Sequence, residues 1–268
     1  MRPPLAHLAL LCLGLVLPML GCQGSGIRFG EDSIITDLFM RGQDNPAEMA
    51  RDLYDPDRRY RGTVRLANEL ADPDPAVVAI FRTNLNDREP SIRAAAARGL
   101  AIHGVAADGT LLARALDDDV AIVRRAAAVA LQRIHHPPAV GRMLQLIDPL
   151  QEPEQTIRVE AALALGQYPQ TPVVLGLVAS LRSDNEQSLA VHRAVVRSLE
   201  LLTGQNFGLD FIAWQRWIDD SRQWFADGQT YTYPVYSRSR RWFEYFPWMP
   251  MPPNETTSSP IGLTRPPR

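Results

Sequence analysis

Four segments of the chain resemble one another, and their spacing constrains the fold more than any other feature of the sequence. Each begins with a β-branched residue and reaches a leucine eight positions later: IRAAAARGL from Ile92, VRRAAAVAL from Val123, IRVEAALAL from Ile157 and VHRAVVRSL from Val191. Their first residues lie 31, 34 and 34 positions apart. Because positions i and i+8 share one helical face, each segment is predicted to be a helix with a buried stripe.

A second amphipathic stretch precedes each of these segments. The four stretches end at Leu85, Leu116, Ile147 and Leu181. An aspartate follows each end within three residues, at Asp87, Asp117 to Asp119, Asp148 and Asp184. Aspartate is typical of a turn and of the N-cap of the next helix. The repeating unit is therefore a helix, a short acidic turn and a helix, which predicts an all-α fold of the α-solenoid kind.

The unit resembles HEAT-like repeats, most closely over DDDVAIVRRAAAVAL, residues 117–131. The resemblance covers residues 46–202 and implies a right-handed α-solenoid of about five helix pairs, with a degenerate first pair over 46–70. It also implies that arginines at one repeat position pair with turn aspartates along the stack, and these are Arg93, Arg124 and Arg158. We interpret them as a structural ladder, with an anion-binding ladder as the alternative.

The N-terminus has the features of a secretory signal sequence. A positively charged start leads into a mostly apolar run from Leu5 to Leu20, which is short for a membrane-spanning helix. The run ends in Met-Leu-Gly-Cys, which resembles the lipobox of bacterial lipoproteins. This implies a signal peptide over 1–21, lipidation of Cys22 and a tether over 22–45. An ordinary signal peptide with an incidental cysteine is the alternative.

Lipidation would place the protein at a membrane, because several acyl chains on one residue anchor a protein stably. We therefore expect it at the cell membrane or the outer membrane, facing the periplasm or extracytoplasmic space. The sequence does not decide between the two membranes. The two cysteines, Cys12 and Cys22, both precede the repeats, so no cysteine-based metal site or disulfide framework is expected in the folded part.

The five tryptophans lie between residues 214 and 248, after the repeats. In the stretch LTGQNFGLDFIAWQRWIDD, residues 202–220, apolar side chains follow at helical spacing behind Asp210, a predicted N-cap. Because the last repeat of a solenoid exposes its stacking face, we predict a C-terminal capping helix over 203–227, with Phe207, Trp214 and Trp217 in the cap. The stretch also resembles a terminal signature of bacterial HEAT-repeat lipoproteins of unassigned function, which implies no activity.

The extended tail after this helix mixes arginine with aromatic residues over 228–249. Three interpretations stay open: folding back onto the cap, docking of a protein partner, and contact with an anionic membrane surface. The candidate contact residues are Arg240, Arg241, Trp242 and Trp248. Residues 250–268 are rich in proline, serine and threonine and are predicted to be disordered.

Few residues are candidates for chemistry. The chain has no lysine, which excludes a Walker-type lysine, a Schiff-base lysine and a Ser-Lys pair. His135 and His136 are adjacent, and side chains adjacent on a helix diverge by about 100°, so we interpret them as cations near a helix C-terminus rather than metal ligands. The recurrence of Asp117–Asp119 at the turn position favours capping over acid–base chemistry. The net charge of −2 gives no basic field for nucleic acid.

We therefore expect a lipid-anchored, extracytoplasmic scaffold that mediates protein–protein interaction at the cell envelope. We expect no enzymatic activity, no cofactor, no metal and no nucleic-acid partner. Two alternatives stay open, a structural envelope component with a membrane-contacting tail and a non-catalytic subunit of an enzyme complex.

Overall fold

The computed structural model describes residues 45–69, 74–182, 188–226, 230–235 and 256–263. They belong to one compact unit, Asn45–Arg268, and their regular structure is helical, apart from a single parallel bridge between Ile134 and Ile261. In these ranges no helix has the length and apolar character needed to cross a membrane. The predicted signal peptide, Cys22 and the tether up to residue 44 lie outside the described residues.

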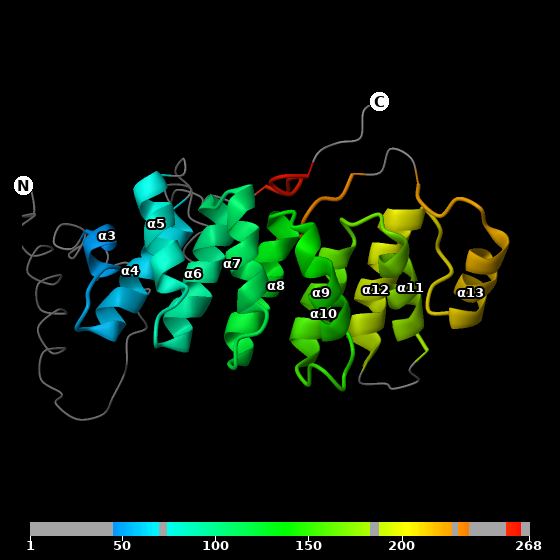
Figure 1. Ribbon diagram of the computed structural model, residues 1–268, viewed down its shortest axis with the longest axis horizontal. Coiled ribbons are helices and arrows are strands. Elements are labelled where there is room, and N and C mark those ends of the chain that lie inside the picture. Colours follow the sequence, from blue (N-terminus) through cyan, green and yellow to red (C-terminus); the bar gives the residue numbers. More distant parts are fainter. Residues whose placement is uncertain (1–44, 70–73, 183–187, 227–229, 236–255, 264–268) are drawn as a thin grey trace, which may run out of the picture. The chain divides into compact units, whose positions relative to one another are not determined.

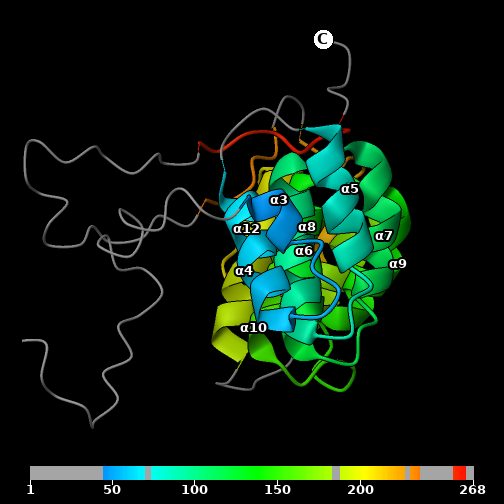
Figure 2. The ribbon, with the colours of Figure 1, turned by 90° about the vertical axis from the view of Figure 1, so that its left-hand side faces the viewer.

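The helices form two layers (Figures 1 and 2). The B layer contains α4 (Pro56–Asn68), α6 (Pro90–His103), α8 (Ala121–Arg133), α10 (Gln155–Leu165) and α12 (Leu189–Thr203). The A layer contains α5 (Pro75–Asn84), α7 (Gly109–Ala115), α9 (Val140–Leu146) and α11 (Thr171–Ser180). Each B helix packs on the next B helix in chain order, and each A helix packs on the B helix that follows it.

Four further elements complete the described part. Helix α3 (Pro46–Met49) packs on α4, and α13 (Phe211–Asp220) packs on α11. The 3₁₀ turns η2 (Ala106–Asp108) and η3 (Pro137–Ala139) lead into α7 and α9. The fold is therefore all-α, as the repeat predicts.

The buried stripes lie where the sequence period places them. Both ends of the first three stripes are at most 1% exposed, and Val191 and Leu199 of the fourth are 3% and 0% exposed. The A helices end with their C-caps at Leu85, Leu116, Ile147 and Leu181, as predicted. Small residues between the stripes allow close approach: a Cβ added to Gly99 would lie 2.4 Å from the Phe81 ring. The predicted helix pairs are confirmed at the level of these elements.

The predicted aspartate N-caps of α6, α8 and α10 are wrong, whereas Asp55 caps α4 and accepts the N–H of Arg58 at 3.0 Å. The N-caps of α6, α8 and α10 are Glu89, Val120 and Glu154, and none of these makes a side-chain cap hydrogen bond. The acidic side chains lie two residues earlier and accept the N–H of the N-cap residue instead, at 2.9 Å for Asp87, 3.0 Å for Asp118 and 3.1 Å for Glu152. The same carboxylates also accept hydrogen bonds from arginines of the preceding repeat. They are therefore not placed to cap the helix that follows them.

The C-terminal helix is shorter than predicted. Gly204 ends α12 with a φ of +70°, which glycine adopts without strain. Asp210 caps α13 as predicted, accepting the N–H of Ala213 at 3.0 Å, and the helix ends at Asp220 rather than near 227. Ser221 leaves the helix in an extended conformation, with φ −90° and ψ 134°.

The prediction of disorder over 250–268 is wrong for residues 256–263. Ile134 leaves α8 in an extended conformation, with φ −118° and ψ 114°, so neighbouring backbone groups are available for pairing. Ile261 uses them: its N–H donates to Arg133 O at 2.7 Å, and its carbonyl accepts from His135 N at 2.9 Å. Tyr233 joins this contact, since its N–H donates to Ser258 O at 3.2 Å and its ring lies 4.7 Å from the Arg133 guanidinium. The tail therefore returns to the C-terminal end of α8.

Candidate functional site

A row of ion pairs runs through the acidic turns and joins successive repeats. In each pair an arginine near the start of one B helix donates two hydrogen bonds, from Nε and Nη2, to a carboxylate of the next acidic turn. The Nε and Nη2 donor distances are 2.6 and 3.1 Å for Arg59 to Asp87, 2.8 and 2.7 Å for Arg93 to Asp118, and 2.7 and 2.9 Å for Arg124 to Glu152. Such bidentate pairs are among the stronger polar contacts in proteins. We call this row the ladder.

The third nitrogen of each guanidinium binds the arginine's own turn. Arg93 Nη1 donates to Asp87 O at 3.0 Å, and Arg124 Nη1 donates to Asp118 O at 2.9 Å. Arg158 continues the pattern, with Nη1 2.7 Å from Glu152 O. The predicted pairing of Arg93 and Arg124 with turn acids is therefore present. For Arg158 the following acidic turn, with Asp184, falls outside the described residues.

Two members of the ladder were not predicted from the sequence. Arg59 lies 34 residues before Arg93, at the same repeat position, in the degenerate first pair. Glu152 stands two residues before an N-cap, like Asp87 and Asp118, but it is a glutamate and follows Asp148 by four residues. A search for either acidic residue at a fixed distance from the next arginine would have found it.

The ladder carboxylates are ionised at neutral pH despite their burial. Burial raises the pKa of Glu152, whose side chain is 1% exposed. The hydrogen bonds from Arg124 and from the Glu154 N–H outweigh this and hold the pKa below its usual range. Asp118 has the same balance, with Arg93 and the Val120 N–H as its donors.

The ladder is built for structure. In Arg59, Arg93 and Arg124 every guanidinium nitrogen already donates to the protein. An anion arriving from solvent would have to displace a bidentate carboxylate. This geometry favours the structural ladder over the anion-binding alternative.

The interpretation of His135 and His136 as helix-end cations is wrong. Burial lowers the pKa of His135, although a contact of 3.1 Å between its Nδ1 and Gln167 Oε1 acts in the other direction. Its ring stacks on Tyr168 at 4.7 Å, and the Tyr168 hydroxyl accepts the His136 N–H at 3.0 Å. Burial also lowers the pKa of His136. Both side chains are therefore neutral near pH 7.

No metal site is evident within the described ranges. Groups of three or more histidine, cysteine, aspartate or glutamate side chains placed to hold an ion are absent there. The ladder carboxylates each face an arginine, which satisfies their charge.

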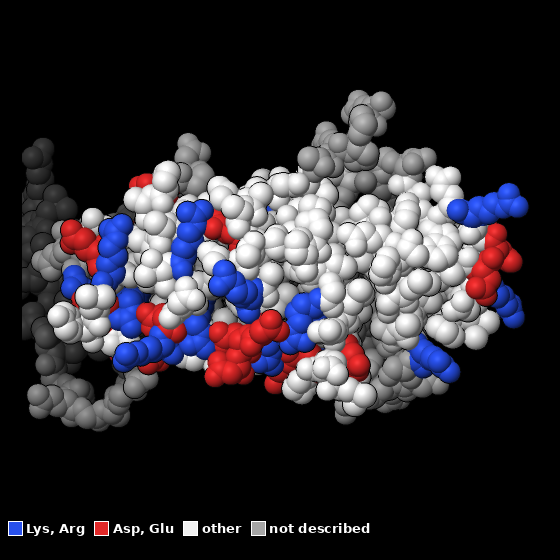
Figure 3. Space-filling model, in the orientation of Figure 1, with Lys and Arg blue, Asp and Glu red and all other residues white. Residues whose placement is uncertain are grey.

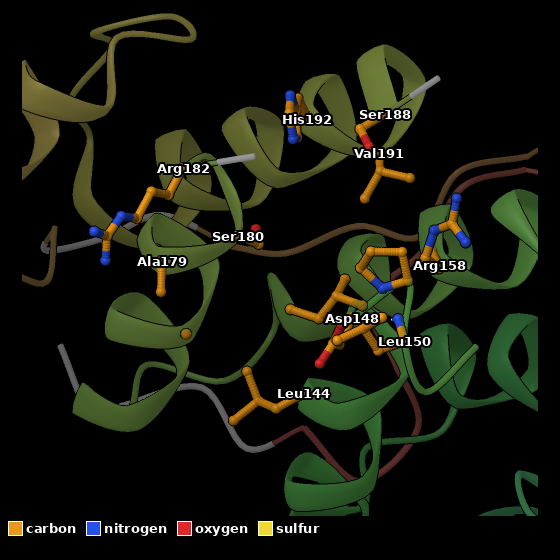
Figure 4. A pocket seen from close by; sticks show the side chains of 13 residues that line it. Leu144, Asp148, Leu150, Arg158, Ala179, Ser180, Arg182, Ser188, Val191 and His192 are labelled. Atoms are coloured by element: carbon orange, nitrogen blue, oxygen red, sulfur yellow. Dashed lines mark hydrogen bonds between the residues drawn. The ribbon is translucent and has the colours of Figure 1, made fainter. Parts of the chain in front are cut away.

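A hollow of about 490 Å³ lies between α9, α11 and the start of α12 (Figure 4). Leu144 and Val191 contribute apolar surface, and Asp148, Arg158 and Arg182 are charged side chains of its lining. Arg158 and Arg182 extend from opposite sides and do not meet in Figure 4. Catalysis needs groups that converge on one reacting atom. The hollow offers no such convergence among its labelled side chains.

The A layer presents a weakly charged surface over α9 and α11. Figure 3 shows this face, where charged side chains gather over the acidic turns and the area over α9 and α11 is largely uncharged. The exposed residues there are small or neutral, for example Gly141, Gln145, Leu175 and Ala179. Among the charged residues of the described A helices, Arg82 pairs with Asp108 and Arg142 pairs with Asp117, and Arg114 is exposed.

The predicted cap residues come together after α12. Phe207 meets Trp214 edge-on at 4.9 Å, and Trp214 meets Trp217 edge-on at 6.1 Å. Trp214 is fully buried, as predicted, and its Nε1 donates to Gly208 O at 2.9 Å. Trp217 is half-buried against the same core. The other candidate contacts, Arg240, Arg241, Trp242 and Trp248, lie outside the described residues.

The described residues thus define an all-α protein whose successive helix pairs are joined by a repeated ion-pair contact. No protein-family model matches the chain, and no curated protein matches it. The function must therefore be inferred from the residues and their arrangement.

Proposed function

We propose that this protein is a lipid-anchored binding scaffold of the cell envelope, built on a right-handed α-solenoid of HEAT-like repeats. The ladder carries the proposal. The same side-chain contact recurs from Arg59 to Glu152 and ties each turn to the next. Repeats that stack by one recurrent contact build an extended surface, and proteins of this kind use that surface to hold a partner.

The packed B helices supply an extended surface for binding. The B helices pack side by side over five repeats, and their outer sides remain open to solvent at positions such as Ile122, which is 56% exposed. The hollow near α11 has no converging polar groups in Figure 4. Together these features support binding of another macromolecule rather than conversion of a small substrate.

Anchoring through Cys22 completes the proposal. The lipobox-like run places the lipid before the tether, so the repeats would face the periplasm or extracytoplasmic space. A cap formed by Phe207, Trp214 and Trp217 would close the C-terminal end of the array. Residues 228–249, with Arg240, Arg241, Trp242 and Trp248, are a second candidate contact for the partner.

The anchor is tested with labelled palmitate in a bacterial host. Wild type and Cys12→Ser, which removes the other cysteine of the N-terminal region, should incorporate the label. Cys22→Ser should lose it. Label on Cys22→Ser equal to wild type would contradict lipidation at this residue.

The scaffold is tested by crosslinking in intact cells, followed by purification and mass spectrometry. We expect one protein at a constant ratio, and tagging that protein should recover this chain in turn. If wild type, properly localised, yields no reciprocally confirmed protein, the scaffold proposal fails.

A further inference from the structure

The outer side of the B helices, which we call the B face, carries a concentration of arginine. The exposed charged residues of the described B helices are Asp57 and six arginines: Arg61, Arg65, Arg98, Arg125, Arg193 and Arg197. In the described A helices Arg82 and Arg142 pair with Asp108 and Asp117, and Arg114 is the exposed arginine that remains. Exposed arginines without a close carboxylate are therefore concentrated on the B helices.

These arginines differ from those of the ladder because their guanidinium N–H groups are available to bind a ligand. Arg61, Arg98, Arg193 and Arg197 have no hydrogen-bond or ion-pair partner among the described residues. Arg125 is 53% exposed and lies 3.7 Å from the buried Glu160. An unpaired guanidinium presents a planar fork of donors that matches a carboxylate. The B face is therefore ready to bind carboxylates, whereas the ladder is saturated.

The arginines lie at the two ends of the B face, and apolar residues lie between them. Helices α4, α6 and α8 supply one group of arginines, and α12 supplies the other. On α10, between them, the outer positions are the exposed Thr156 and the half-buried Val159 and Leu163. Packed helices are about 8–10 Å apart, so the four spacings from α4 to α12 span roughly 32–40 Å. An extended peptide covers that distance with about 12 residues.

We propose that the B face docks an acidic segment of a protein partner, with carboxylates at both ends of the segment and apolar side chains at its centre. The inference rests on the proposed function and adds the chemistry of the partner. A uniform polyanion such as nucleic acid would leave the apolar outer side of α10 without a match. An anionic bilayer supplies acyl chains, but the half-buried Val159 and Leu163 expose too little side chain to insert into it. A protein segment can supply both chemistries, which is why it is the favoured occupant.

The test uses the purified full chain and a fluorescent peptide of 16 residues, with four glutamates at each end and an apolar centre. The variant combines Arg98→Gln, Arg193→Gln and Arg197→Gln. The control combines Arg114→Gln, Arg216→Gln and Arg222→Gln, which removes the same charge from exposed positions away from the B face. We expect the variant to bind the peptide at least tenfold more weakly, and the control within twofold of wild type.

Three outcomes would overturn the inference: no binding of the peptide by wild type, equal weakening by both triple variants, or tighter binding of phosphatidylglycerol vesicles or an oligonucleotide through the same three arginines. Far-UV circular dichroism of each variant checks that the fold is unchanged. Crosslinking in cells separates this inference from the scaffold itself. If the B-face variant recovers the partner at wild-type yield, the acidic docking site is refuted and the scaffold stands.

Discussion

Replacing Asp118 with asparagine should destabilise the fold far more than the same replacement at Asp119. The two aspartates are adjacent and contact the same guanidinium, Arg93. They differ in burial, because the side chain of Asp118 is 13% exposed and that of Asp119 is 88% exposed. They also differ in bonding, because Asp119 accepts only one hydrogen bond from Arg93, at 3.2 Å. The pair therefore compares a buried, fully bonded carboxylate with an exposed one beside the same arginine.

The expected magnitude follows from the hydrogen bonds that Asp118 accepts. Arg93 donates to its two oxygens at 2.8 and 2.7 Å, and the Val120 N–H donates at 3.0 Å. Asparagine keeps one acceptor oxygen and turns an N–H₂ group toward a donor. Hydrogen bonds to charged groups contribute about 1.5–3 kcal/mol, and breaking a buried ion pair costs about 3–5 kcal/mol. Because Arg93 keeps its carbonyl contacts, we expect a loss of about 2–3 kcal/mol for Asp118→Asn.

Asp119→Asn should change the free energy of unfolding by about 0.5 kcal/mol or less, since exposed ion pairs contribute little. Both values are measured by urea unfolding, followed by far-UV circular dichroism and by tryptophan fluorescence. The dichroism reports all helices, whereas the tryptophans lie between residues 214 and 248 and report the C-terminal end. If the repeats unfold as one unit, both signals shift together. Equal effects at the two positions, or an Asp118→Asn effect below about 0.5 kcal/mol, would refute the role given to the ladder.

Three further predictions concern the core. Trp214→Ala should cost about 3–5 kcal/mol, because it empties a fully buried site and removes a hydrogen bond; urea unfolding measures it, and a loss near zero would argue against a packed cap. Gly99→Ala should destabilise by about 1–3 kcal/mol, since its Cβ would meet Phe81, while Gly141→Ala in α9, with nothing within 4 Å, should stabilise by up to about 1 kcal/mol. Burial lowers the pKa of His135 in the folded state, so the unfolded chain binds a proton at higher pH than the folded chain does. The free energy of unfolding should therefore decrease as the pH drops below about 6.5. His135→Gln should make this decrease smaller, and a free energy of unfolding that increases on acidification would contradict the prediction.

The periodic part of the fold was predictable because it rests on local pattern. A buried β-branched residue and a buried leucine eight positions later fix the face of each B helix, as for Ile92 and Leu100. The helix ends followed from where the apolar pattern stops. These features need no knowledge of which repeat packs on which, so one sequence sufficed.

The features that the sequence did not predict depend on contacts between repeats. Glu152 has its role because Arg124 reaches it from the preceding repeat. Burial lowers the pKa of His135, and part of the surface that buries its ring comes from Tyr168, 33 residues later. Ile261 pairs with the end of α8 because Ile134 happens to leave the helix extended. Likewise the sequence alone does not predict which arginines are exposed on the B face, because the neighbouring helices determine their exposure.

The central claim is that the B face docks the partner, and the most direct test identifies the face that contacts the partner in the cell. A photo-crosslinking amino acid is placed at Ile122 on the B face or at Leu175 on the A face, which are 56% and 44% exposed aliphatic positions. We expect an adduct with one protein partner from position 122, lost when Arg98, Arg193 and Arg197 are changed to glutamine, and none from position 175. Adducts from position 175 alone, or none from either position, would contradict it.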